Sequence, residues 1–244
     1  AMDAPGIASF GPVKGRFFRL VTNRATNISE VCLHASSRLK DWTAKANYVK
    51  NPVALGAYDR QDVSGQTIDR SDVVDVTPFM DDNGYLKWHA PRTASRWTIL
   101  RIGSTTTGEV VAAAPDSGVG LDCDKFSKIA LDQHFDEFLT PLLNKLKPWC
   151  GKSLKALMMD SWEAGKQNWT ASLPAYFREH CGYDPTPWLL AMTGRIVEST
   201  EKTERFLYDM RRTQTDMFNE NFLTHFKERA AQHGLKFAAE PYGD

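Results

Sequence analysis

The residues best suited to chemistry follow an apolar run. Residues 154–159 read Leu-Lys-Ala-Leu-Met-Met, and Asp160 and Glu163 come next with Trp162 between them. Such runs are typical of buried parallel strands, and an acid at the carboxyl end of a barrel strand is more often chemical than structural. Glycoside cleavage needs two carboxyl groups, one that protonates the leaving group and one that activates water or attacks the anomeric carbon. The pattern therefore predicts a sugar-cleaving site.

Glu163 is the candidate general acid. A carboxyl group beside the indole of Trp162 is partly removed from water, which disfavours its ionised form and suits it to donate a proton. Asp160, at the tip of the strand, could orient a sugar hydroxyl, bind a metal ion or tune Glu163. In the structural alternative Asp160 caps the following loop, and Glu163 pairs with Lys166 or Arg195.

A second apolar run, residues 235–239, ends at Glu240, with Tyr242 two residues later. Because the carboxyl ends of parallel strands face one cavity, Glu240 is expected near Asp160. Three roles are open for it: second catalytic carboxylate, ligand of a sugar hydroxyl, or ligand of a cation. The structural alternative is a buried ion pair with an arginine such as Arg101.

Aromatic rings and further acids complete the set of candidates. The flat faces of Trp162, Trp169 and Tyr242 suit the carbon face of a sugar ring, although tryptophans are more often core residues. Asp122 and Asp124 follow a loop of small residues and precede a helix. The preferred interpretation of this pair is that one of them is the N-cap of that helix.

Composition excludes several other classes of protein. Thirty Lys and Arg residues balance thirty Asp and Glu residues in 244, so no nucleic acid or membrane partner is predicted. The six histidines form no zinc motif, and no nucleophile elbow or phosphate-binding loop is present, so no organic cofactor is expected. A neutral chain rich in aromatic residues fits an uncharged ligand such as carbohydrate.

The chain divides into two parts by its pattern. Residues 1–95 contain short runs of β-branched and aromatic residues, with a turn at 81–84, and are predicted to be a β-rich accessory segment. Residues 96–244 alternate strands with long helices, which indicates an α/β fold with a parallel sheet. We interpret them as part of a (β/α)8 TIM-type barrel, incomplete at the C-terminus, because a whole barrel needs roughly 200 to 250 residues. The rest of its own polypeptide is then an expected partner.

The individual elements of the second part follow from local patterns. Pro141 is expected either to kink the helix at 135–146 or to start a second helix, because proline lacks the N–H that the helix requires. Short helices and turns are expected at 174–194. Apolar residues spaced by three, four and seven over 206–230 predict a long helix that ends at Gly234. Strands are expected at 97–103, 154–160 and 235–240.

Several motifs together resemble a known family. They include Asp-Ser-Trp-Glu at 160–163, Gln-Asn-Trp-Thr at 167–170 and Glu-Pro-Tyr-Gly at 240–243. Further motifs stand at 97–103, 105–108, 120–125, 183–184, 193–195 and 205–209. The pattern, which runs through nearly all of residues 72–244, resembles glycoside hydrolase family 106, which contains α-L-rhamnosidases. The resemblance adds Asn168, Asp122 and Asp124 to the candidate sugar ligands.

The resemblance implies a (β/α)8 catalytic domain with β-rich attachments, an inverting mechanism and a periplasmic or secreted location. It leaves room for a calcium ion that engages sugar hydroxyls, with ligands that the sequence does not identify. It assigns the general acid to Glu163. The general base is expected downstream of residue 244, and the first strands of the barrel are expected upstream of residue 1.

The predicted function is therefore hydrolysis of terminal α-L-rhamnose in glycans with inversion. The two catalytic carboxyl groups of an inverting enzyme stand roughly 6.5 to 9.5 Å apart. Two alternatives remain. A retaining barrel glycosidase of another specificity would use Glu163 and Glu240 at about 5 Å. A non-catalytic fragment would only bind carbohydrate.

Overall fold

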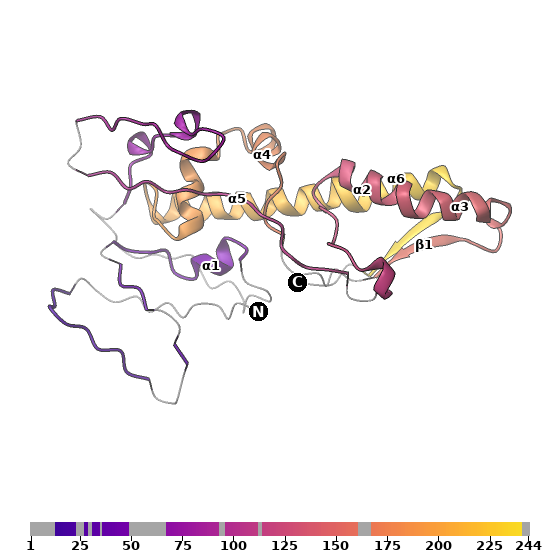
Figure 1. Ribbon diagram of the computed structural model, residues 1–244, viewed down its shortest axis with the longest axis horizontal. Coiled ribbons are helices and arrows are strands. Elements are labelled where there is room, and N and C mark those ends of the chain that lie inside the picture. Colours follow the sequence, from indigo (N-terminus) through magenta and orange to yellow (C-terminus); the bar gives the residue numbers. More distant parts are fainter. Residues whose placement is uncertain are drawn as a thin grey trace.

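The structure is a computed structural model that describes residues 13–22, 27–28, 31–34, 36–48, 67–92, 96–111, 114–160 and 167–240. Helices dominate the described residues, together with a two-stranded parallel sheet. The molecule is elongated, and one long helix runs along much of its length (Figure 1). Other elements gather around the two halves of that helix in two separate cores.

The long helix is continuous from residue 200 to residue 232. It consists of α5 (Thr200–Phe218), the π-helical turn η7 (Asn219–Thr224) and α6 (His225–Gln232). The hydroxyl of Ser199 accepts the N–H of Lys202 and caps its start, while Gly234 follows its end with φ 72°. Most of the predicted apolar positions are buried: Phe206, Met210, Met217, Phe222, Phe226 and Ala230. The predicted helix and its glycine stop are confirmed.

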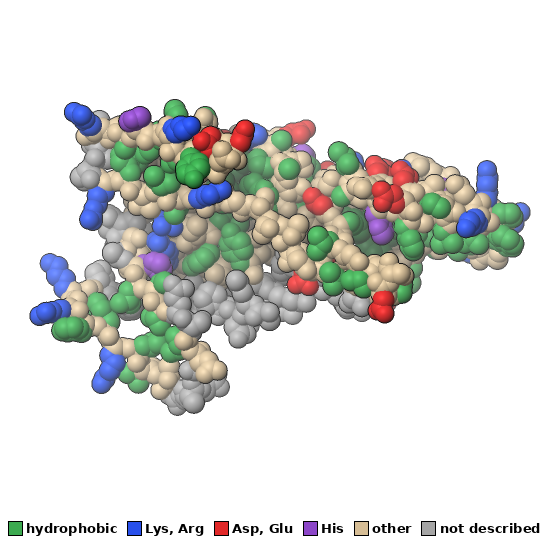
Figure 2. Space-filling model, in the orientation of Figure 1, with side chains coloured by type: hydrophobic (Ala, Val, Ile, Leu, Met, Phe, Trp, Pro, Cys, Tyr) green, Lys and Arg blue, Asp and Glu red, His purple; other side chains and the backbone are tan. Residues whose placement is uncertain are grey.

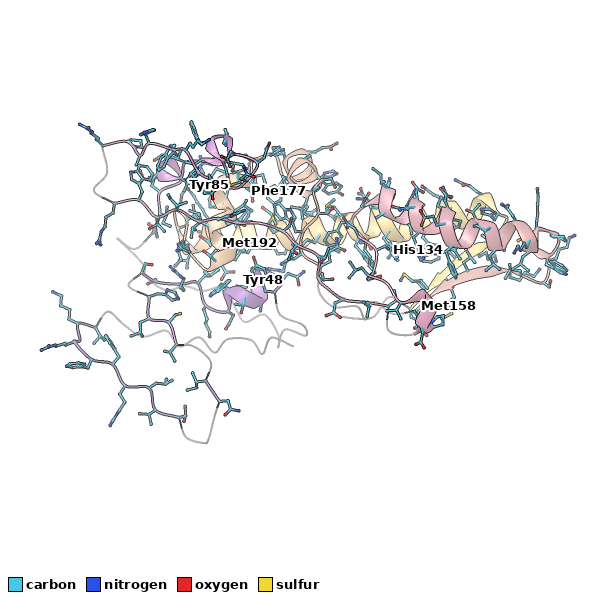
Figure 3. All side chains as sticks on the ribbon, viewed as in Figure 1. Tyr48, Tyr85, His134, Met158, Phe177 and Met192 are labelled. Carbon is cyan, nitrogen blue, oxygen red and sulfur yellow. The ribbon has the colours of Figure 1, made fainter. Side chains whose placement is uncertain are left out.

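The first core surrounds the N-terminal half of α5. Three helices pack there: α1 (Trp42–Lys45), α4 (Leu173–Cys181) and the 3-10 helix η6 (Thr186–Thr193). Phe177 and Met192 lie in this core (Figure 3). Gly194 ends η6 with φ 78°, and a Cβ atom there would lie 2.6 Å from ring atoms of Trp42. Glycine therefore allows η6 and α1 to approach each other closely.

The second core lies between helices and one face of the sheet. The helices that precede the sheet are α2 (Lys128–His134), the π-helical turn η4 (Phe135–Leu139), α3 (Thr140–Leu146) and the 3-10 helix η5 (Lys147–Trp149). Phe135, Leu143 and Phe226 are buried between them and α6. The π-helical turn ends at Leu139, two positions before Pro141, which cannot donate a main-chain hydrogen bond. The irregularity predicted at Pro141 is therefore a change from π-helix to α-helix at Thr140, within a helix that has no gap.

The sheet joins two strands that are far apart in sequence. Strand β1 (Ala156–Met159) pairs in parallel with β2 (Lys236–Ala239), and Met159 lies opposite Ala239. Leu157 and Phe237 pack against the helical core, whereas Met158 is 65% exposed on β1 (Figure 3). All of α4, η6, α5, η7 and α6 lie between the two strands in sequence. The strands predicted at 154–160 and 235–240 are confirmed, and their parallel pairing fits an α/β fold. The closed barrel stays a prediction.

The described residues of 1–95 do not form the strands predicted there, and the β-rich accessory segment stays a prediction. Those residues contain α1, the 3-10 helices η1 (Arg70–Asp72) and η2 (Thr77–Phe79), and isolated bridges, but no strand. The strand expected at 97–103 is also absent, and the next element is the 3-10 helix η3 (Asp116–Gly118).

Unsatisfied pairing explains these differences. A strand needs a neighbour along its length for its main-chain groups, and the described residues give these runs at most isolated bridges, such as Met80 with Leu86. Their apolar side chains are exposed instead, with Phe17 at 83% and Val21 at 72%. Hydrophobic side chains are visible on the surface in many places (Figure 2). The predicted turn at 81–84 is confirmed, because Gly84 has φ 81° and the Asp81 carboxylate accepts the N–H of Tyr85.

No helix within the described ranges combines the length and the apolar character needed to cross a bilayer.

Candidate functional site

Two of the candidate acids meet at one edge of the sheet. Asp160 and Glu240 are the residues that directly follow β1 and β2, and the N–H of Glu240 donates to the carbonyl of Met159 at 3.1 Å. Parallel pairing therefore continues to the last residue of β1 and places both acids at the carboxyl ends of neighbouring strands. Asp160 is exposed and Glu240 is half-buried. Both side chains are accessible at the edge where α/β proteins bind ligands.

Three predicted site residues lie outside the described residues. Glu163 and Trp162 fall within 161–166, and Tyr242 falls within 241–244. Lys166, a proposed alternative partner of Glu163, lies outside them as well. Their predicted roles stay predictions, and so does the separation of Glu163 from Glu240.

Asp124 binds the segment that follows residues 161–166. Its Oδ2 accepts the hydroxyl of Thr170 at 2.6 Å, and its Oδ1 accepts both the side-chain amide of Gln167 and the N–H of Phe126. The interpretation of Asp122 or Asp124 as the N-cap of the next helix is wrong, because Ser127 caps α2. The carboxylate of Asp124 instead makes a local turn and a contact with residues more than forty positions away.

Asp122 pairs with a buried lysine. Its carboxylate accepts the ammonium group of Lys125, whose side chain is 7% exposed. The same ammonium group lies 5.7 Å from the ring centroid of Phe222. Burial lowers the pKa of Lys125 to about 8, whereas the carboxylate of Asp122 favours the charged form. In this structure Asp122 compensates a buried charge.

Asn168 and Trp169 both contact the protein's own interior. The side-chain amide of Asn168 donates to the main-chain carbonyl of Asn47 at 3.4 Å. The main-chain carbonyl of Asn168 accepts the side-chain amide of Gln214 at 3.0 Å. Trp169 is half-buried and packs against the first core. The part of each side chain that stays accessible could still contact a ligand.

Gln214 and Asn47 are the residues that sequence analysis missed. The Oε1 atom of Gln214 accepts the side-chain amide of Asn47 at 2.9 Å, so Gln214 ties α1 and residue 168 to α5. Gln214 is 4% exposed. The sequence contained one signal for Gln214, which is its position on the apolar face of the long helix between Met210 and Met217. A buried amide needs hydrogen-bond partners, so this position indicates a polar contact in the core.

Within the described ranges, no group of three or more His, Cys, Asp or Glu side chains is arranged to hold a metal ion. Asp160 and Glu240 are the carboxylates that share the sheet edge. The calcium ion suggested by the resemblance therefore stays a prediction.

The chain matches known proteins both in sequence and in structure. A sequence model described as alpha-L-rhamnosidase, of glycoside hydrolase family 106, matches residues 16–244. A curated protein of Formosa agariphila, provisionally named a beta-glucuronidase, is 39% identical over 179 residues, which are 73% of this chain and 15% of that protein. The solved rhamnosidase from Novosphingobium sp. PP1Y superposes with a TM-score of 0.67 at 26% identity, over 85% of this chain and 20% of that one. The chain thus spans a minor part of both relatives.

Proposed function

Because this chain belongs to glycoside hydrolase family 106, the α-L-rhamnosidase family, we propose that the protein containing it removes terminal α-L-rhamnose from glycans with inversion. In this proposal Glu163 donates the proton to the leaving group. Asp160 and Glu240 bind sugar hydroxyls or hold a cation at the ends of β1 and β2. The side chains proposed to contact the sugar ring are Trp162, Trp169 and Tyr242.

The observation that carries the proposal is the pairing of β1 with β2. It brings Asp160 and Glu240 to adjacent strand ends, although eighty positions separate them in sequence. Active sites of (β/α)8 enzymes are built on the carboxyl ends of strands. A strand, its helices and the next parallel strand form one repeat of such a barrel, and we propose that the rest of the polypeptide supplies the other repeats.

The charges at this edge favour a neutral sugar. Rhamnose carries no ionisable group, whereas a glucuronide carries a carboxylate. If Asp160 and Glu240 bind hydroxyls and hold no cation, they would repel that carboxylate, and the repulsion between like charges grows as water is excluded from the site. This argument favours rhamnose over the substrate that the name of the Formosa agariphila relative suggests.

The substrate is tested by offering the native polypeptide that contains this chain two chromogenic compounds, nitrophenyl α-L-rhamnoside and nitrophenyl β-D-glucuronide. The proposal predicts release of nitrophenol from the rhamnoside at a rate well above that from the glucuronide. Preference for the glucuronide would overturn the substrate assignment and keep a glycosidase. Hydrolysis of neither compound would favour the carbohydrate-binding alternative.

The stereochemistry is tested by proton NMR of the first product formed. Inversion predicts that β-L-rhamnose appears first and equilibrates with the α-anomer afterwards. A first product in the α-configuration would indicate retention, and with it a direct role for Glu240 as the nucleophile that partners Glu163.

A further inference from the structure

The segment that contains the proposed acid is held at both of its described ends. Before it, Met159 is the last residue of β1, and its carbonyl accepts the N–H of Glu240 at 3.1 Å. After it, the described chain resumes at Gln167. In the sequence, Glu163 comes three positions after Asp160 and four positions before Gln167. The bond of Met159 to Glu240 is the first anchor and residues 167–170 are the second, and both lie close to Glu163 along the chain.

Asp124 is the centre of the second anchor. Its carboxylate accepts the hydroxyl of Thr170 at 2.6 Å and the side-chain amide of Gln167, while Gln167 Oε1 accepts the N–H of Lys125 at 3.0 Å. These bonds close a ring between residues 124–125 and residues 167–170. Thr170 is 8% exposed, so its bond to a carboxylate is shielded from water. A charged acceptor in such surroundings makes a strong hydrogen bond.

The anchor has a matching contact on its other side. The buried side chain of Gln214 donates to the carbonyl of Asn168 and accepts from Asn47. Residues 167–170 are thereby held between the turn at Asp124 and the long helix α5. Of these contacts, only those made by Asp124 involve a charged group, its carboxylate.

We propose that Asp124 is a positioning residue for catalysis, which fixes the exit of the segment that carries Glu163 and does not itself bind the sugar. The proposal rests on the proposed function in one respect, the role of Glu163 as the acid. Its physical basis is that proton donation demands close alignment, so that a displacement of about 1 Å costs roughly 100-fold in rate. The anchor supplies that alignment from outside the sugar site.

The test compares Asp124→Ala in the native polypeptide with Asp69→Ala. Asp69 is a suitable control because its carboxylate also accepts a neighbouring N–H and hydroxyl, those of Ser71, but lies exposed elsewhere. Two substrates are used. Methyl α-L-rhamnoside needs a proton on its leaving group, whereas dinitrophenyl α-L-rhamnoside releases a stable anion without one.

The expected result for Asp124→Ala is a fall of about 100-fold in kcat on the methyl glycoside, with KM changed less than about threefold. The dinitrophenyl glycoside should lose less than about tenfold, and Asp124→Asn should lie nearer the parent because its amide oxygen still accepts. Asp69→Ala should match the parent. Equal losses on both substrates would show general damage and overturn the proposal, as would parental rates on both.

Amide hydrogen exchange gives a readout that needs no activity. In Asp124→Ala, peptide 167–173 should exchange at least tenfold faster than in the parent, whereas peptides from α5 should not change. If Asp124→Ala fails to fold, Thr170→Val removes one arm of the anchor and should raise exchange in the same peptide. Unchanged exchange would overturn the anchor. A parent that hydrolyses no rhamnoside would instead refute the proposed function, while the exchange result still decides whether Asp124 holds this segment.

Discussion

Replacement of Lys45 by methionine should loosen the contact between α1 and α5. Lys45 Nζ lies 2.5 Å from Glu204 Oε1, and both side chains are 4% exposed. Helix α1 has four residues, far fewer than an isolated helix needs to be stable in water. Its order must therefore come from such tertiary contacts, and the buried ion pair is the strongest electrostatic one that it makes.

The size of the effect follows from the charge that the substitution leaves behind. Removal of one partner of a buried ion pair costs about 3 to 5 kcal/mol. The guanidinium of Arg211 donates to the main-chain carbonyl of Lys45, so a second cation remains beside this turn in the variant. We therefore expect the lower end, about 3 kcal/mol, which corresponds to a change of roughly 150-fold in the opening equilibrium.

Hydrogen exchange at the amides of α1 measures this opening. The N–H groups of Lys45, Ala46 and Tyr48 donate to main-chain carbonyls within this turn, so their protection reports whether α1 is closed. Lys45→Met should lower that protection by roughly 150-fold, whereas the double variant with Glu204→Leu should restore most of it because no buried charge remains. The control Lys202→Met removes an exposed pair and should change protection by less than about threefold.

Two results would refute this reasoning. Parental protection in Lys45→Met would mean that the ion pair does not hold α1 in place. A double variant as open as the single one would mean that lost packing, and not the uncompensated charge of Glu204, causes the effect.

Two further predictions concern pH and shape. Burial lowers the pKa of Lys125 to about 8 from its ordinary 10.5, so the unfolded chain binds more protons between these values and stability rises with pH through this window. The free energy of unfolding in urea should increase with pH more in the parent than in Lys125→Met. The difference between the two proteins should grow by at most about 3 kcal/mol from below pH 8 to about pH 10.5. A difference that does not change with pH would contradict this. Gly194→Ala should cost about 1 to 3 kcal/mol more than Gly182→Ala in thermal unfolding, because both glycines have φ near 78° but only the former faces the ring of Trp42. Equal costs would contradict the close packing.

Periodic elements were predictable because their signal is local. The spacing from Phe206 to Ala230 defines one face of a helix, and that face is buried in the structure. The runs that end at Asp160 and Glu240 are strands, and their meeting at one edge followed from the rule for parallel sheets. The two strands and the long helix between them position the described residues of the candidate site.

Two kinds of feature were not predictable. The runs around Phe17 and Ile99 have the composition of strands, but a strand also needs a partner, and composition does not reveal whether one is present. The contact of Asp124 with Gln167 and Thr170 joins residues more than forty positions apart, so local preference suggested a helix cap instead. In both cases the outcome depends on contacts between distant parts of the chain.

The π-helical turns lie between these extremes. Pro141 predicted a kink or a new start in its helix, but it did not predict the π-helical turn at residues 135–139. The second turn, at residues 219–224, has no proline within it. The stacking of Phe218 on Phe222, with ring centroids 5.6 Å apart, accompanies this turn without explaining it.

The most direct test of the proposed function is the dependence of Glu163→Gln on the leaving group, measured in the native polypeptide. If Glu163 is the general acid, hydrolysis of methyl α-L-rhamnoside should fall by about 100-fold to 10,000-fold. Hydrolysis of dinitrophenyl α-L-rhamnoside, whose leaving group needs no proton, should stay within about tenfold of the parent. Parental rates on the methyl glycoside in Glu163→Gln would contradict the assignment of the acid.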